Sequence, residues 1–466
     1  MPGVYLDRKS GAHGLIARED LSADGGVVRD SPSGLRGEEI VLAIGGAATL
    51  ELWKAQFHFT PRAPGEALQA FRDRAGISVY YNINELGLGR ELGCAEFPDG
   101  AGTGQACFVT NYGIGFSDGA AALERAIEGA TPKNTVCITR RPSLGPEYEV
   151  QFYVFGPDGK AQSWAQLDTL GPRPHPQVCT ECHGGAYDEQ TKLAKGAHFL
   201  PLYPDVVLYA EDFGIVGPAG VTKAGQLERT RVINALAEKT QLTTSQRERL
   251  DGNYDGLVRS PGAPYHGDWV PPGWDTDAWS RRMYHDVIAP YCVTCHDASA
   301  AAEHPELYRF SSQQRFLEDS ASVLSYVCDT FTMPNAQPTM RSFWQTHLAD
   351  FPPAPNGRRA ATPAEAMLAG YGRVATASGC KNLAQVVRCA GEDVCGNAQS
   401  GTFCDSETRT CGPTSGDPRL PAGASGFCRV AAEGAPRGCP VPLSCVAYDG
   451  GPLGADGAAY DGICVL

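Results

Sequence analysis

The sequence predicts a multidomain α+β protein with a β-rich N-terminal domain, a mainly α-helical middle domain and a small disulfide-rich C-terminal module. Three observations predict this fold class. The chain has 466 residues, and at roughly 150 residues per domain this length suggests about three domains. Strand-like segments gather in residues 1–170. Nine of the 17 cysteines lie in residues 380–466, a density typical of a disulfide scaffold.

The domain boundaries follow from these changes in composition. We expect a β-rich domain of unknown role at residues 1–170 and a helical domain at 171–350. A proline- and alanine-rich linker with one helix follows at 351–377, and the cysteine-rich module occupies 378–466.

The N-terminal domain carries clear strand and turn signals. Residues 148–155 and 162–167 are strand-like runs around the turn sequence Gly-Pro-Asp-Gly at 156–159, which predicts a β-hairpin. A helix is expected after Ser117, ending at Gly129. Further strands are expected at residues 77–83, 107–112 and 135–140. No catalytic constellation is visible in this domain, which indicates a packing or partner-binding role.

The middle domain shows helical rather than strand patterns. Apolar residues recur at helical spacing within residues 222–240. A second helix is expected at residues 276–289, stopped by Pro290.

Two copies of the pattern C-x-x-C-H carry the chemistry of the middle domain. They consist of Cys179, Cys182 and His183 in the first copy and of Cys292, Cys295 and His296 in the second. This pattern is the attachment signature of c-type haem. Cysteines one helical turn apart can each form a thioether with one vinyl group of a porphyrin, and the adjacent histidine then binds the iron. The sequence therefore predicts two haem c groups, with His183 and His296 as proximal ligands.

Redox activity, structural zinc and chance compete with haem attachment as the origin of the two motifs. A redox-active C-x-x-C normally lies in a thioredoxin-like βαβ setting, which is not visible here. A structural zinc site from two C-x-x-C pairs has about 15–20 residues between the pairs, whereas these lie over a hundred apart. Chance can produce one C-x-x-C-H in a cysteine-rich chain, but two copies outside the tail make chance a weak explanation.

The ligand on the distal face of each iron decides what a haem can do. At the second site Met333 precedes a proline and is the expected distal ligand, with Met340 as runner-up and a role as core filler as the alternative. At the first site His198 is preferred, with His175 and an open iron as alternatives.

Three segments resemble bacterial di-haem c-type cytochromes and other proteins with cytochrome c domains. They are CTECHGG at residues 179–185, YCVTCH at 291–296 and CDTFTMPNAQPTMRSFW at 328–344. The resemblance covers about the middle third to two-fifths of the chain. It implies a cytochrome c-like haem domain and electron transfer by iron that cycles between the ferrous and ferric states. The distal pattern of the family is not met at the first haem.

The thirteen cysteines outside the haem motifs form an odd number, so at least one is free or intermolecular, and Cys137 is the candidate. Cys94 and Cys107 bracket a glycine-rich loop and are expected to pair; two unpaired buried thiols are the alternative. A bridge between Cys328 and Cys380 is a further hypothesis. The tail could instead store metal, which would need zinc sites of four cysteines each.

These features predict an exported electron-transfer protein, periplasmic or at the cell surface, since c-type haem is attached outside the bacterial cytoplasm. The residues near Met1 do not form a signal peptide, so we expect a leader that the start omits. A net charge of −14 argues against nucleic acid or anionic membrane as the main partner and suits a basic redox partner. The longest apolar stretch, residues 40–52, is too short to span a bilayer.

Three alternative functions are compatible with the same sequence features. One is a di-haem peroxidase, or another haem enzyme, in which the first iron is open. Another is a secreted binding or surface protein with a haem module. The third is a cytosolic thiol-rich protein.

Overall fold

The computed structural model describes residues 46–113, 119–162, 164–165, 173–188, 190–191, 193–293, 296–297, 310, 312–320, 323, 339, 343, 346, 348, 350–354, 357, 360, 362–371, 402–404, 411–413, 427–428, 444–447 and 462–465. Its contacts divide the chain into two compact units. The larger unit comprises residues 35–165 and 175–316, and the smaller unit comprises residues 1–34, 166–174 and 317–466. Helices and antiparallel sheets are both present, which confirms the α+β class.

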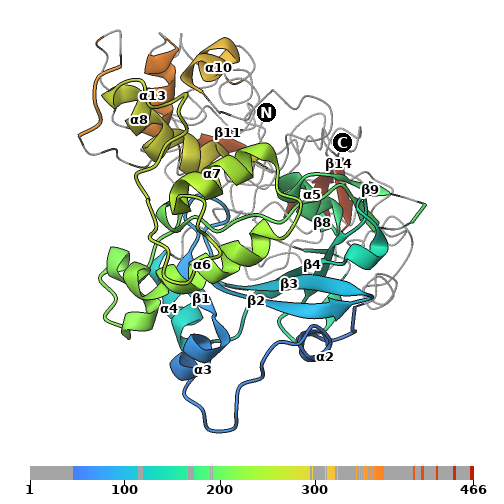
Figure 1. The fold of residues 1–466 in the computed structure, drawn as a ribbon. Helices are drawn as coiled ribbons and strands as arrows, with labels where there is room; N and C mark the ends of the chain where they lie inside the picture. Colours follow the sequence, from blue (N-terminus) through green and yellow to red (C-terminus); the bar gives the residue numbers. More distant parts are fainter. Residues whose placement is uncertain are drawn as a thin grey trace. The chain divides into compact units, whose positions relative to one another are not determined.

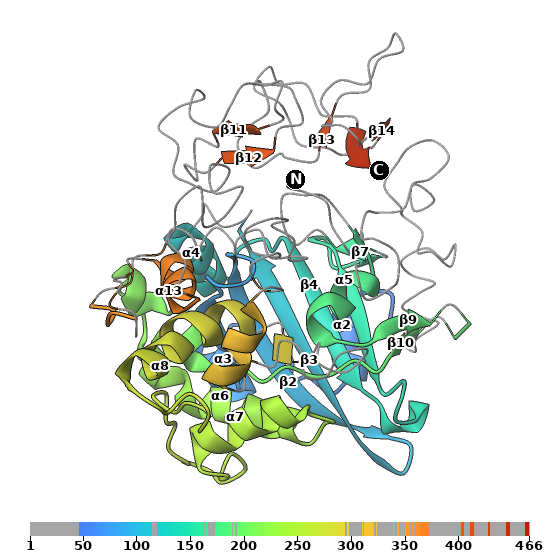
Figure 2. The same cartoon turned by 90° about the horizontal axis from the view of Figure 1, so that it is seen from above.

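A six-stranded antiparallel sheet organises the larger unit (Figure 1). Its strands follow one another in chain order: β1 (Ser78–Tyr81), β2 (Gly89–Asp99), β3 (Gly102–Tyr112), β4 (Asn134–Arg140), β5 (Val150–Phe155) and β6 (Ala161–Gln162). Each segment expected to form a strand overlaps one of these, and the predicted hairpin is the β5–β6 pair. The long β2–β3 hairpin projects farthest from the sheet (Figure 2).

Both faces of this sheet are buried, which is why β5 is buried along its whole length rather than alternating. On one face the sheet packs against α2 (Leu50–Gln56) and α3 (Leu68–Ala75). That cluster contains Trp53, Phe57, Ile77, Phe97, Ala106, Phe108, Cys137, Tyr153 and Phe155.

The opposite face of the sheet packs against the segment that follows the first C-x-x-C-H motif. Tyr80, Leu92 and Phe152 of the sheet share one cluster with Phe199 and with Ile233 of α6 (Lys223–Glu238). The hydrophobic core is therefore continuous across the domain boundary that the sequence predicts near residue 170.

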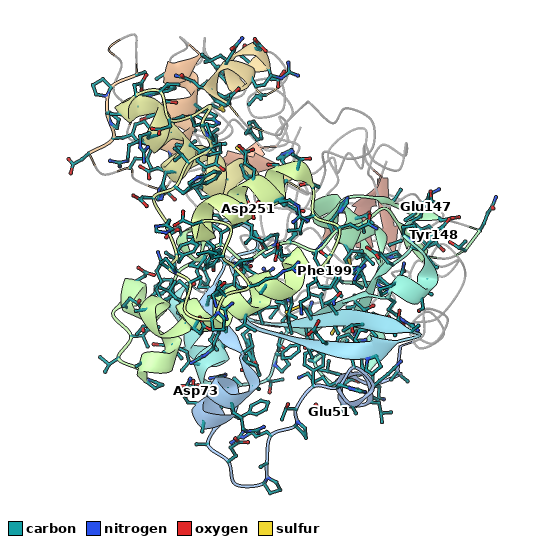
Figure 3. All side chains as sticks on the ribbon, in the orientation of Figure 1. Glu51, Asp73, Glu147, Tyr148, Phe199 and Asp251 are labelled. Carbon is teal, nitrogen blue, oxygen red and sulfur yellow. A yellow bond between two sulfur atoms is a disulfide. The ribbon has the colours of Figure 1, made fainter. Side chains whose placement is uncertain are left out.

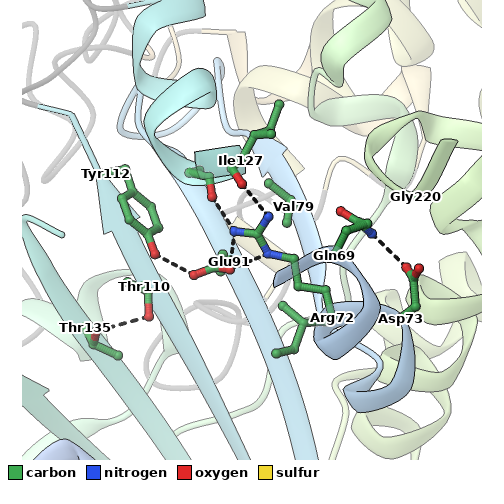
Figure 4. A network of polar contacts seen from close by, with 12 residues as sticks. Gln69, Arg72, Asp73, Val79, Glu91, Thr110, Tyr112, Ile127, Thr135 and Gly220 are labelled. Carbon is green, nitrogen blue, oxygen red and sulfur yellow. Dashed lines mark hydrogen bonds and ion pairs between the residues drawn. The ribbon is translucent and has the colours of Figure 1, made fainter. Parts of the chain in front are cut away.

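Helix α4 (Ala120–Glu128) covers the β1–β2–β3 end of the sheet and ends at Gly129, as predicted. Gly129 closes the helix with φ of 66°, a left-handed conformation that glycine adopts without strain. The buried Arg72 of α3 donates hydrogen bonds to the carbonyl oxygens of Ala126 and Ile127 in the last turn of α4 (Figure 4). Arg72 also pairs with Glu91, which accepts a hydrogen bond from the Tyr112 hydroxyl at 2.5 Å.

The edge of the sheet at β1 is closed by residues far along the chain. The buried Gln226 side chain of α6 accepts a hydrogen bond from Val79 N at 2.5 Å and donates one to Val79 O at 2.7 Å. Leu208 exchanges a pair of backbone hydrogen bonds with Tyr81. These bonds satisfy main-chain groups that an open edge strand would expose.

The remaining elements of the larger unit are short helices and hairpins. They are η3 (Pro142–Leu144), β7 (Trp164–Ala165), α5 (Gln177–His183), β9 (Ala186–Asp188), β10 (Leu193–Lys195), η4 (Pro204–Val206), η5 (Ala210–Phe213), η6 (Ala219–Val221), α7 (Thr244–Tyr254), α8 (Ala278–Met283) and η7 (Tyr284–Val293). α10 (Gln313–Glu318) follows them.

The prediction that Pro290 stops a helix is wrong. Helix α8 continues directly into η7, a π-helix that contains Pro290 and ends at Val293. A proline breaks an α-helix because it lacks an N–H and crowds the carbonyl four residues before it. The hydrogen bonds of a π-helix run five residues back, so the wider turn relieves this crowding and the helix reaches the second motif.

The described parts of the smaller unit include a helix and two small sheets. Helix α13 (Pro363–Gly370), capped by the Thr362 hydroxyl, is the single helix expected in the linker. Strand β8 (Arg173–Pro174) also belongs to this unit. In the cysteine-rich tail β11 (Thr402–Cys404) pairs with β12 (Cys411–Pro413), and β15 (Gly462–Val465) lies between β13 (Phe427–Cys428) and β14 (Ser444–Ala447).

Candidate functional sites

The first C-x-x-C-H motif lies on helix α5, so Cys179 and Cys182 are one helical turn apart. Both side chains are partly buried, and neither belongs to a disulfide. Burial, and to a smaller extent the neighbouring Cys182, raises the pKa of the Cys179 thiol. Both cysteines are therefore thiols with the spacing that thioether attachment requires.

A glycine pair brings the chain back to the motif. Gly184 and Gly185 follow the helix with φ of 74° and 78°. A Cβ on Gly185 would lie 2.3 Å from the carbonyl oxygen of Lys195, so only glycine lets β10 approach this closely. The return places His198 beside His183, whose carbonyl oxygen accepts a hydrogen bond from His198 N at 2.8 Å.

The imidazole of His183 is held by a hydrogen bond to the returning chain at His198. Its Nδ1 lies 2.8 Å from the carbonyl oxygen of His198, and because a carbonyl oxygen can only accept, Nδ1 carries the hydrogen. In the neutral ring Nε2 then holds the free electron pair. The ring packs edge-on against Phe152 of β5, with 5.1 Å between centroids. This arrangement suits a metal-binding histidine, since such a ring normally donates its other N–H to a carbonyl or carboxylate.

His198 and His175, the two candidate distal ligands at this site, have different surroundings. The Nδ1 of His198 lies 2.6 Å from the carbonyl oxygen of Gln241, and its own carbonyl lies on the Nδ1 side of His183. His175 is buried and donates from Nε2 to the Phe152 carbonyl oxygen at 2.8 Å, while its Nδ1 has no hydrogen-bond partner among the residues that the structure describes. Burial lowers the pKa of His175 to about 4, so the ring is neutral. The assignment of His198, or of His175, as the distal ligand stays a prediction.

The second motif is described in part. Cys292 lies in the last turn of η7, belongs to no disulfide, and has its pKa raised to about 12 by burial. His296 packs edge-on against Phe310, with 5.7 Å between ring centroids. Cys295, Met333 and Met340 all lie outside the described residues, so the predicted roles of these three residues stay predictions.

The residue after His296 is held by the start of helix α7. Asp297 is buried; its backbone carbonyl accepts a hydrogen bond from the Thr243 hydroxyl at 2.8 Å, and its carboxylate accepts one from Ser245 at 2.5 Å. Burial raises the pKa of Asp297 to about 6, a shift that the Arg249 charge opposes. Sequence patterns did not mark these contacts, although the capping pattern Thr-x-x-Gln at 243–246 marks the start of α7.

The cysteines outside the two C-x-x-C-H motifs include one disulfide and one buried thiol among the described residues. Cys94 on β2 and Cys107 on β3 form a disulfide, which confirms that prediction. Cys137 is a buried thiol, and burial raises its pKa well above the ordinary value. The hypothetical Cys328–Cys380 bridge lies outside the described residues.

Within the described parts of the chain, no group of three or more His, Cys, Asp and Glu side chains could hold a metal ion. No helix found there is long and apolar enough to cross a bilayer. Comparison with family models, with curated proteins and with solved structures finds no match to this chain.

Proposed function

We propose that this protein is an exported electron-transfer protein that carries two covalently attached c-type haems. The observation that carries the proposal is the hydrogen bond from His183 Nδ1 to the His198 carbonyl oxygen. In a ring that follows a C-x-x-C pair, this bond leaves Nε2 with the electron pair that a proximal iron ligand must offer.

The residues of both motifs have the roles that attachment requires. Cys179 and Cys182 would form the two thioethers of the first haem, and His183 would bind its iron. Cys292, Cys295 and His296 would do the same at the second. A bound haem supplies a one-electron couple between ferric and ferrous iron, tuned by its ligands and its burial. The protein holds the histidine rings by packing, through Phe152 at the first site and Phe310 at the second.

Export is supported by the disulfide between Cys94 and Cys107, because disulfides persist in oxidising compartments. The attachment of c-type haem also takes place outside the bacterial cytoplasm. An acidic chain with a net charge of −14 would be steered towards a basic redox partner.

A second candidate function is a di-haem peroxidase or a related haem enzyme. It is favoured by one observation: the His198 carbonyl oxygen binds Nδ1 of His183, so the His198 main chain lies on the side of that ring opposite to Nε2. A residue in that position does not face the distal side of an iron bound to Nε2, and an iron at the first site without a distal side chain would be open to peroxide.

The experiment is a haem count on full-length protein exported by a host that attaches c-type haem. A pyridine haemochrome assay should find two thioether-linked haems. Replacing Cys179 and Cys182 by alanine should remove one, and replacing Cys292 and Cys295 should remove the other. Cys137→Ala, a change outside both motifs, should leave two. A wild-type count below two would overturn the proposal.

The two candidate functions are separated by the spin state of the iron. Two six-coordinate low-spin haems that do not react with carbon monoxide support electron transfer. A high-spin ferric band together with rapid spectral change on adding peroxide supports the enzyme.

A further inference from the structure

We infer that the start of helix α7 is a hydrogen-bonded bridge that couples the two haem-attachment motifs, with His198, Thr243 and Ser245 as positioning residues for the two proximal histidines. This inference rests on the proposed function. It adds that the redox states of the two haems depend on each other through named protein contacts.

The bridge consists of residues 241–246, the end of the connection from α6 and the first residues of α7. Thr243 caps α7: its hydroxyl accepts a hydrogen bond from Gln246 N at 3.2 Å, and the Gln246 side chain accepts one from Thr243 N at 2.9 Å. This reciprocal cap fixes the backbone of the segment. Gln246 is also fully buried, so the bridge is anchored in the core.

One side of the bridge holds the second motif. Thr243 and Ser245 bind the carbonyl and the carboxylate of Asp297, as described above. Two hydrogen bonds from one helix end to the residue next to His296 leave that residue little freedom to move without α7. A displacement of the bridge therefore alters the position of His296.

The other side of the bridge holds the first motif. The Gln241 carbonyl oxygen binds the His198 ring at 2.6 Å, and the Gln246 side chain donates to the carbonyl oxygen of Phe199 at 3.1 Å. The side chain of Phe199, labelled in Figure 3, packs in a core cluster that also contains Ile233 and Ala237 of α6. His198 in turn makes two backbone-level contacts with His183, through its N–H and its carbonyl oxygen.

A short chain of contacts thus joins two histidines that are far apart in the sequence. It runs from His183 through His198, Gln241, Thr243 and Asp297 to His296, and all of it lies in the larger unit. The Nδ1 bond of a proximal histidine changes how strongly its Nε2 donates to the iron. A change of ligand position at one haem is therefore transmitted to the other, and coupling of this kind is reciprocal.

The test uses the haem-loaded full chain and a redox titration fitted to two midpoint potentials. Thr243→Val removes the hydroxyl with little change of shape, and His198→Ala removes the ring bond to Gln241. Each should shift both potentials, and the double variant should be non-additive, because the two residues act along one chain of contacts.

Two further variants guard against a purely structural effect. Thr243→Ser keeps the hydroxyl and should restore the wild-type potentials. Thr244→Val changes the exposed neighbouring threonine and should shift neither potential. If Thr243→Val destabilises the fold, Ser245→Ala removes only the Asp297 carboxylate bond and should still move both potentials.

The outcomes distinguish this inference from the function on which it rests. If both haems are present but each single variant shifts only one potential, or the shifts add in the double variant, the bridge is overturned and the proposed function stands. A wild-type protein without two haems would overturn both.

Discussion

Arg72 of α3 and Glu91 of β2 form an ion pair inside the protein, with 2.6 Å between Nη2 and Oε1. The guanidinium group also binds two carbonyl oxygens at the end of α4 (Figure 4). One side chain thus ties two helices to the sheet. All donors of such a buried charge must be satisfied, because an unpaired buried group costs far more than the net gain from a pair.

Arg72→Met should destabilise the larger unit strongly. It removes the guanidinium that the Glu91 carboxylate and two carbonyl oxygens share as a donor, and breaking a buried pair from one side costs about 3–5 kcal/mol. Urea unfolding followed by circular dichroism measures the loss. The matched control is Arg74→Met on the same helix, which breaks a more exposed pair with Glu66 and should cost much less. Equal losses in the two variants would contradict a structural role specific to Arg72.

His175 should make stability depend on pH between about 4 and 6.5. The folded ring has a pKa of about 4, against an ordinary value of 6.5, because it is buried. The unfolded chain therefore binds more protons than the folded protein in this pH range. The contribution of His175 to the free energy of unfolding is thus complete above pH 6.5 and is lost as the pH falls to about 4. Its full size is about 3 kcal/mol.

His175→Gln removes this titration, and its amide can still donate to the Phe152 carbonyl oxygen. Urea unfolding between pH 4 and 7.5 should show a smaller loss of stability on acidification than in the wild type. The control His58→Asn replaces an exposed imidazole and is compared with the wild type over the same pH range. An unchanged slope in His175→Gln would show that His175 does not titrate as its burial requires.

The sequence predicts those turns and helix ends that are determined by residues close together in the chain. The β5–β6 hairpin follows from a Gly-Pro-Asp-Gly turn between apolar runs, and the end of α4 follows from Gly129. The prediction at Pro290 is wrong, because proline breaks or kinks an ordinary α-helix, whereas the π-helical winding of η7 accommodates it. The Gln226 bonds to Val79 join residues far apart in the sequence, and no local pattern marks such a contact.

The sequence predicts only those parts of the site that depend on the identity of a side chain. The two C-x-x-C-H motifs are visible in the sequence, but the acceptor of the His183 bond is a backbone carbonyl, which every residue possesses. The sequence marks His198 only as a histidine near the motif, whereas its contacts with His183 are made by its main chain. The bonds from Thr243 and Ser245 to Asp297 depend on how α7 packs, which the capping pattern alone does not reveal.

Reduction of the Cys94–Cys107 disulfide should destabilise the β2–β3 hairpin. The two cysteines are 13 residues apart, and a cross-link that closes a loop of this size contributes about 3 kcal/mol by restricting the unfolded chain. The Cys94→Ala/Cys107→Ala variant should unfold at lower urea concentration than the oxidised wild type. Adding a reductant to this variant should produce no further loss from the hairpin, which would separate the effect of this bridge from the effect of the bridges expected in the tail.

Two disulfides in the tail are predicted from strand register. Cys404 lies directly opposite Cys411, and Cys445 directly opposite Cys464, just as Cys94 lies opposite Cys107. Opposed residues of antiparallel strands have Cα atoms about 4.5–5.5 Å apart, which matches the spacing of a disulfide. Peptide mapping without reductant should recover the pairs Cys404–Cys411 and Cys445–Cys464, with the Cys94–Cys107 peptide as internal control. Recovery of any of these four tail cysteines linked to a different partner would contradict this connectivity.

Met333 is expected to bind the iron of the second haem. A ferric haem with histidine and methionine ligands has a weak near-infrared absorption band, so Met333→Ala should abolish that band in the haem-loaded protein. The midpoint potential of that haem should also fall, because a thioether ligand raises it. Met340→Ala is the matched control and should keep the band. If Met340→Ala removes the band and Met333→Ala does not, the ligand assignment passes to Met340, and if neither does, the distal ligand is not methionine.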